Sequence, residues 1–127
     1  MDINGNVDAE QRNIEIYPKH GKINQQWDLI YTDEWKTLKK GDLNEDFGMY
    51  IERDFHIVTQ LKSNRYLSTV NKKDMVIKTP NGFKSQIWYF DQASLTIRSR
   101  ENNRSWDIKN AGRTSDMQVW STNSGWF

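Results

Sequence analysis

Hydrophobic and polar residues alternate over short runs along most of this chain. A period of two over four or five residues, bounded by Asn, Gly and Pro clusters, is typical of strands with one buried face. No stretch of ten or more residues shows a convincing helical period. The pattern therefore predicts an all-β protein. The clearest alternating runs are 14–17, 56–60, 75–78, 95–98 and 117–120.

Three of these strands are followed by similar turns that contain glycine. Pro-Lys-His-Gly follows Tyr17, Thr-Pro-Asn-Gly follows Lys78, and Ser-Thr-Asn-Ser-Gly follows Trp120. Repetition of this kind indicates an internal repeat, which constrains the fold more strongly than local propensity does. Each of the three strands is also preceded by a short segment, and these segments are 1–3, 66–69 and 105–108.

The triplet Gln-x-Trp occurs three times, ending at Trp27, Trp88 and Trp120. Trp27 follows Tyr17 by ten residues, and Trp88 follows Lys78 by the same ten. Trp120 instead ends an alternating run, so its triplet is not equivalent to the other two. Large aromatic residues dominate core energetics, and we expect Trp27 and Trp88 to be core residues. Their Gln partners are expected to bond backbone groups between repeats.

The chain is expected to form one domain over residues 1–127, because it is long enough for a single core. The pattern places repeat one at about 1–33, repeat two at about 55–92 and repeat three at about 93–127. The stretch 34–54 is longer than most connections in compact domains. We expect it to be an irregular insertion that packs through Trp35, Phe47 and Tyr50.

A segment like Leu-Asp-Ile, a strand ending in an aromatic residue and then Asn-Gln-x-Trp, repeated threefold, resembles the ricin B-type β-trefoil lectins. The resemblance spans about 1–30 and 55–127. It implies a six-stranded barrel capped by three hairpins, with up to one sugar site per repeat. Against that pattern the first and last repeats are incomplete, lacking one strand each. Three explanations are open: the chain is a fragment, the insertion completes the barrel, or a second copy of the chain completes it.

A site for a neutral sugar needs a carboxylate that accepts from neighbouring hydroxyls, an aromatic plate and an orienting amide. The resemblance assigns these roles in repeat one to Asp2, Glu15, Tyr17, Asn24 and Gln25. Glu15 stands where the family usually has Gln, which adds a negative charge. Repeat one therefore has every part of a sugar site.

Repeat three has the corresponding carboxylate, amide and aromatic residue. The resemblance assigns them to Asp107, Gln118 and Trp120, with Asn123 nearby. The terminal Asn-Gln of this repeat falls beyond the last residue of the sequence. We expect repeat three to be the second sugar-binding repeat.

Repeat two lacks the acceptor and the plate. Ser68 stands in the place of the aspartate, Lys78 in that of the aromatic residue and Ser85 in that of the asparagine. We therefore expect this repeat to be structural only. The aspartate and the aromatic residue are present together in two repeats and absent together in the third, which favours a shared functional role.

Simpler structural roles are open for the same residues. Asp2 and Asp107 could be turn residues with local side-chain hydrogen bonds to the backbone. Tyr17 and Trp120 could be exposed aromatic residues at the rim of amphipathic strands. Independent roles of this kind would not predict the correlation between repeats.

Composition and motifs exclude several other functions. The net charge of +1 gives no electrostatic reason to expect a nucleic-acid or acidic-membrane partner, and the absence of cysteine excludes thiolate chemistry. No catalytic or phosphate-binding motif is present, and His20 and His56 lack neighbouring metal ligands. We expect no enzyme activity, cofactor or metal. Glu52 and Asp54 are expected to form a solvated face.

The sequence predicts a lectin module that recognises galactose-type or related sugars through repeats one and three, without catalysis. Two alternatives stay open. One is a trefoil that has lost sugar binding and serves as a protein-interaction module, scaffold or inhibitor. The other is the targeting module of a larger enzyme. No signal peptide is expected from the first residues, and the compartment is left open.

Overall fold

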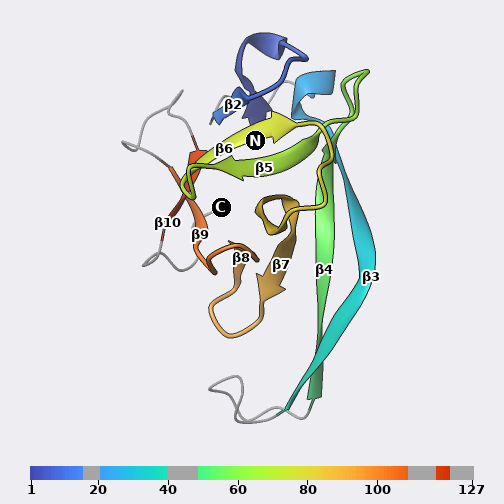
Figure 1. Ribbon diagram of the computed structural model, residues 1–127, viewed down its shortest axis with the longest axis vertical. Helices are drawn as coiled ribbons and strands as arrows, with labels where there is room; N and C mark the ends of the chain where they lie inside the picture. The colour runs from blue at the N-terminus through green and yellow to red at the C-terminus, as the bar shows by residue number, and fades with distance from the viewer. Residues whose placement is uncertain (16–20, 40–48, 109–116, 121–127) are drawn as a thin grey trace.

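The computed structural model describes residues 1–15, 21–39, 49–108 and 117–120 of the chain. These residues form antiparallel β-structure with three short 3-10 helices (Figure 1). The prediction of an all-β protein is therefore confirmed. Each of the five alternating runs lies wholly or partly in a strand of the structure. Residues 16 and 17 of the first run lie outside the described residues.

Three hairpins form one part of the sheet. Their partner residues correspond, with Asp2 opposite Glu15, Ser68 opposite Val76, and Asp107 opposite Gln118. Strand β6 pairs with both β2 and β10, and these two strands also contact each other. The three hairpins thus meet through their second strands. The hairpins are β1 (Asp2–Ile3) with β2 (Arg12–Glu15), β5 (Tyr66–Val70) with β6 (Asp74–Lys78), and β9 (Ser105–Ile108) with β10 (Met117–Trp120).

Four further strands lie side by side beyond the hairpins, in the order β8, β7, β4 and β3. Figure 1 shows β3 and β4 as two long adjacent ribbons on one side of the molecule. Strand β3 comes last in this order and forms the edge of the described sheet. The bounds are β3 (Trp27–Lys39), β4 (Met49–Thr59), β7 (Trp88–Asp91) and β8 (Thr96–Ser99).

The stretch 34–54 is not irregular where the structure describes it. Its residues before 40 belong to β3, and those from 49 onward belong to β4. The two strands pair from Trp35 opposite Arg53 to Lys39 opposite Met49, beyond a register shift near Tyr31. The expectation that this stretch is irregular is therefore wrong where the structure describes it, whereas its assignment as an insertion between repeats stays a prediction. The packing expected of Trp35, Phe47 and Tyr50 lies outside the side chains that the structure describes.

The first two Gln-x-Trp triplets have the same local structure. Gln25 ends the 3-10 helix η2 (Ile23–Gln25) and Trp27 begins β3, while Gln86 ends η3 (Lys84–Gln86) and Trp88 begins β7. The third triplet lies inside β10. The predicted difference between the triplets is confirmed. The remaining 3-10 helix, η1 (Asn4–Asn6), connects β1 towards β2.

The core contains buried residues from all three hairpins and from β4 and β7. Trp88 is fully buried in it, and Trp27 is partly buried and packs against it. Trp88 Nε1 donates to the Leu67 carbonyl at 3.1 Å, and Trp27 Nε1 donates to the Met1 carbonyl at 3.3 Å. The two bonds are equivalent, because Met1 directly precedes Asp2 and Leu67 directly precedes Ser68. The prediction of core residues is confirmed for Trp88, whereas Trp27 lies at the margin.

The loop between β1 and β2 is fastened to the rest of the fold by what we call the Arg65 cluster, formed by Arg65, Asp8 and Glu10. Arg65 forms ion pairs of 2.9 Å with Asp8 and with Glu10. Burial alone would raise the pKa of Asp8, but hydrogen bonds from Ser63 and the charge of Arg65 hold it below its usual 3.8. A hydrogen bond from the Thr79 hydroxyl, assisted by Arg65, holds the pKa of Glu10 below its usual 4.5.

Candidate functional site

The first hairpin brings three of the predicted sugar-binding residues together around one carboxylate. Asp2 lies in β1 and is only 3% exposed. Asn24 Nδ2 donates to Asp2 Oδ1 at 2.9 Å, and Gln25 Nε2 donates to Asp2 Oδ2 at 2.9 Å. Asn24 Nδ2 also lies 3.2 Å from the carbonyl oxygen of Ile3. The carboxylate is held in one orientation, with an amide group beside each of its oxygens.

A tight turn fixes the orientation of the Gln25 amide. The backbone N–H of Gly21 donates to Gln25 Oε1 at 3.1 Å, which leaves the amide nitrogen for Asp2. Gly21 has a φ of +70°, in the left-handed region that favours glycine. Gln26 Nε2 donates to the Gly21 carbonyl at 2.8 Å and so closes the turn. The helix η2 and this turn together position the donors.

The third hairpin repeats part of this arrangement. Asp107 in β9 lies opposite Gln118 in β10, as Asp2 lies opposite Glu15. Gln118 Nε2 donates to Asp107 Oδ2 at 3.1 Å. Gln118 is buried, and its Oε1 has no hydrogen-bond partner among the described residues. Buried polar atoms are nearly always hydrogen-bonded, so an acceptor that the described residues leave unpaired is unusual.

The second hairpin differs in the expected way. Ser68 is fully buried opposite Val76, and its hydroxyl donates to the backbone carbonyl of Thr69 at 3.1 Å. No carboxylate or amide occupies this pair of positions. Sequence reasoning missed Glu101, whose Oε1 accepts from the Thr69 hydroxyl at 2.9 Å. Thr69 follows Ser68 directly, so its side chain points to the other face of the strand.

Not every predicted residue can be placed. Tyr17 and Asn123 lie outside the described residues. The backbone of Trp120 lies in β10 opposite Ser105, and that of Glu15 lies in β2 opposite Asp2. The structure therefore brings together Asp2, Asn24 and Gln25 in one place and Asp107 and Gln118 in another. The aromatic plates stay predictions from the sequence.

Two of the simpler roles can be judged from these positions. Asp2 and Asp107 both lie in strands, so their interpretation as turn residues is wrong. Gln86 accepts from the Asn81 N–H at 3.0 Å and donates to the Thr79 carbonyl at 2.9 Å. The expectation that the triplet glutamines bond backbone groups is thus confirmed for Gln86, although within a repeat rather than between repeats. The side chain of Gln25 accepts from the Gly21 N–H and donates to the Asp2 carboxylate.

Sequence reasoning also missed what we call the Arg100 cluster, formed by Arg100, Glu52, Asp54 and Tyr89. Arg100 donates to Asp54 Oδ1 at 2.6 Å and forms an ion pair with Glu52, and its Cζ lies 3.7 Å from the Tyr89 ring centroid. Glu52 is only 8% exposed, so the expectation of a solvated acidic face is wrong. Burial raises the pKa of Tyr89 above its usual 10.0. Arg100 lies 46 and 48 residues from Asp54 and Glu52 in the sequence, so no local sequence pattern predicts the cluster.

The described residues contain no group of three or more His, Cys, Asp or Glu side chains that could hold a metal ion. His56 lies in β4, where Nδ1 is 2.9 Å from the Gln86 carbonyl and the ring stacks on Tyr66 with centroids 4.6 Å apart. In the part of the chain that the structure covers, no helix is long and apolar enough to span a membrane.

None of the protein families, curated proteins and solved structures with which the chain was compared matches it.

Proposed function

We propose that this protein is a carbohydrate-binding module with a β-trefoil architecture and no catalytic activity of its own. Support for the architecture comes from three hairpins with corresponding register that meet through their second strands. Further support comes from two equivalent turns in which a Gln-ended 3-10 helix precedes a tryptophan. Both indoles also donate to equivalent backbone carbonyls.

One observation carries the proposed function. Asp2 and Asp107 lie at equivalent positions of the first and third hairpins. Each accepts a hydrogen bond from a glutamine amide, which is Gln25 of η2 for Asp2 and Gln118 of the facing strand for Asp107. In the second hairpin, serine and valine take the equivalent pair of positions. A fold that needed the aspartate and amide for stability would be expected to keep them in all three hairpins.

The chemistry of these groups suits sugar hydroxyls. A carboxylate held by amides is a strong, oriented acceptor for neighbouring hydroxyl groups, and an amide both donates and accepts. Tyr17 and Trp120 would supply the aromatic faces for the C–H side of a sugar ring, as the resemblance to ricin B-type lectins implies. The same resemblance suggests galactose-type sugars as the ligand class.

Two sites on one body also suit the way in which lectins gain affinity. Single shallow sites bind weakly, whereas two sites that engage one multivalent glycan act together through effective concentration. We therefore expect weak binding of monosaccharides and much stronger retention on surfaces that carry dense glycans.

A glycan array with densely displayed sugars tests the proposal. The wild-type chain should bind galactose-terminated glycans, and the double variant Asp2→Asn/Asp107→Asn should bind at least about tenfold more weakly, because charge-assisted hydrogen bonds are lost. Tyr17→Ala and Trp120→Ala should each weaken binding without unfolding the chain. Lys78→Ala, at the equivalent position of repeat two, is the matched control and should leave binding unchanged.

Circular dichroism of each variant separates loss of binding from loss of fold. If Trp120→Ala unfolds the domain, Trp120 is a core residue and the assignment of the third site is wrong. If the folded wild-type chain binds no glycan at high density, the lectin proposal is wrong as a whole.

A further inference from the structure

The edge strand β3 exposes three consecutive hydrophobic residues. Leu29, Ile30 and Tyr31 are 51%, 48% and 50% exposed. No described strand pairs with the outer side of β3, which is the last strand in the sheet order. Figure 1 shows β3 as the outermost ribbon beside β4. An edge of this kind presents backbone donors and acceptors to any further strand.

On the inner face of the sheet, the apolar layer ends abruptly at this edge. Leu29 lies opposite Ile57, and Tyr31 lies opposite Phe55. Ile57 and Phe55 are both buried, although their neighbours on β3 are half exposed. A cavity of about 350 Å³ adjoins the edge, and Leu29, Tyr31 and Phe55 contribute to its lining. The apolar residues that bury Ile57 and Phe55 of β4 therefore do not cover Leu29 and Tyr31 of β3.

The outer face of the sheet is also apolar at the same point. Ile30 lies opposite His56, whose ring stacks on Tyr66. Of the three exposed residues of β3, a small molecule in the cavity would cover Leu29 and Tyr31, because Ile30 is not part of the lining. A further β-strand would cover both faces and satisfy the backbone edge as well, and such strand addition is a common mode of recognition. The surface thus fits a strand better than it fits a small ligand.

We propose that β3 pairs antiparallel with β3 of a second copy of this chain, about a two-fold axis at Ile30. In this register Ile30 lies opposite the partner's Ile30, and Leu29 lies opposite the partner's Tyr31. Each apolar side chain then meets an apolar side chain on its own face of the sheet. Asp28 lies opposite the partner's Thr32, so no like charges face each other. The triplet is self-complementary, as a two-fold interface requires.

The small contact area limits the strength of this association. Three side chains and a short stretch of backbone per copy form an interface at the small end of the range for specific complexes. We expect a reversible dimer with a Kd on the order of 100 µM. The proposal does not depend on the sugar sites, whose residues lie in the hairpins and in η2 rather than in β3.

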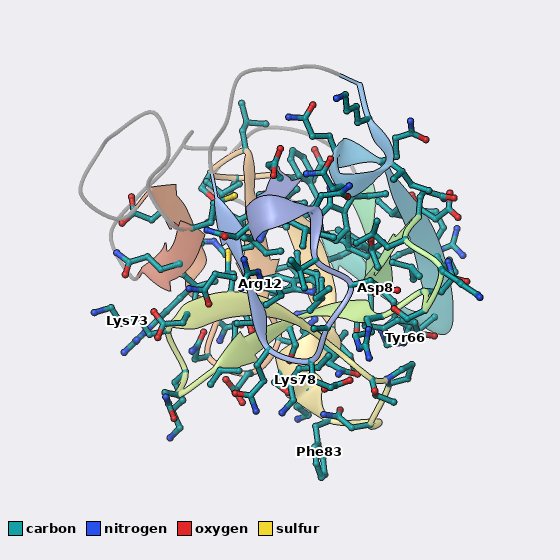
Figure 2. The ribbon with its side chains drawn as sticks, turned by 90° about the horizontal axis from the view of Figure 1, so that it is seen from above. Asp8, Arg12, Tyr66, Lys73, Lys78 and Phe83 are labelled. Atoms are coloured by element: carbon teal, nitrogen blue, oxygen red, sulfur yellow. The ribbon has the colours of Figure 1, made fainter. Side chains whose placement is uncertain are left out.

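Sedimentation equilibrium of the full chain, from about 10 µM to 1 mM, measures this association at the concentrations that matter. Ile30→Lys should weaken the dimer at least about tenfold, because a charged lysine would lie opposite its own copy in the joined strands. The matched controls are Phe83→Lys and Leu95→Lys, which change residues that are 67% and 58% exposed. Phe83 projects away from the body of the protein (Figure 2), and neither control should alter the dimer.

Hydrogen exchange of the wild-type chain gives a second readout that needs no variant. The outward-pointing amides of residues 28–32 should exchange more slowly as protein concentration rises, whereas amides elsewhere should not change. A chain that stays monomeric up to millimolar concentration would overturn the proposal, and would leave a strand of another protein as the partner for β3. A dimer that the control substitutions weaken as much as Ile30→Lys would overturn it as well.

Discussion

Substitution of the two triplet tryptophans should reveal unequal contributions to the core. Trp88 is fully buried, lies edge-to-face with Trp106 at 6.0 Å between ring centroids, and donates to the Leu67 carbonyl. Removal of a buried tryptophan side chain costs about 3–5 kcal/mol, and the lost hydrogen bond adds to this. We therefore expect Trp88→Ala to lower the free energy of unfolding by roughly 4–6 kcal/mol.

Trp27 makes the equivalent hydrogen bond to the Met1 carbonyl but is only partly buried. Since the loss scales with the apolar area removed from the core, Trp27→Ala should cost about half as much, roughly 2–3 kcal/mol. Small domains are stable by only about 5–15 kcal/mol, so Trp88→Ala could unfold the chain outright. Trp88→Phe is the milder variant, because it keeps a buried ring but loses the indole N–H. We expect it to cost about 1–3 kcal/mol.

Urea unfolding followed by far-ultraviolet circular dichroism measures these differences on the wild-type chain and the three variants. The order of stability should be wild type, then Trp27→Ala and Trp88→Phe, then Trp88→Ala. If Trp27→Ala costs as much as Trp88→Ala, burial does not govern the contribution of these two residues to stability. A Trp88→Phe variant as stable as wild type would show that the bond to Leu67 contributes nothing.

Two further predictions concern charged clusters. Arg100→Met should lower the free energy of unfolding by about 3–5 kcal/mol because Glu52 stays buried without its partner, and Arg100→Met/Glu52→Gln should recover part of the loss in the same urea assay. Asp8 and Glu10 have pKa values below their usual 3.8 and 4.5 in the folded chain. On acidification, these carboxylates are therefore protonated at a higher pH in the unfolded chain than in the folded chain. Their stabilisation is therefore complete above about pH 5 and is lost as the pH falls through the lowered folded values. The melting temperature of Arg65→Gln should fall less on acidification than that of the wild-type chain. If the two proteins lose the same amount, Arg65 does not lower the pKa values of Asp8 and Glu10.

The sequence predicted those features that depend on local pattern. Period-two alternation located strands such as β6, because one face of each strand must be buried. The constant distance to Trp27 and Trp88 separated two equivalent triplets from the one in β10, because turn geometry repeats with the sequence. The sequence assigns Asp107 and Gln118 to the same sugar site, although it does not show that they lie opposite each other in paired strands. In these examples, residues of one type that recur at a fixed spacing predict the local structure.

The features that the sequence missed depend on contacts between distant residues. The length of 34–54 predicts an irregular stretch, whereas β3 and β4 pair with each other through much of it. Strand pairing is not encoded in a short window, and charged residues such as Lys36 and Glu52 obscure the alternation there. Arg100 reaches Asp54 across 46 residues of sequence, so only the folded chain shows the cluster.

The central claim is that the first and third hairpins bind a sugar and the second does not. Titration of the isotopically labelled chain with methyl β-galactoside, followed by amide chemical shifts, tests this claim residue by residue. We predict saturable shifts at residues 2–3, 24–25, 107 and 118, with the amides of Ser68 and Val76 unmoved. An absence of shifts at high millimolar sugar, or shifts centred on the second hairpin, would contradict the account.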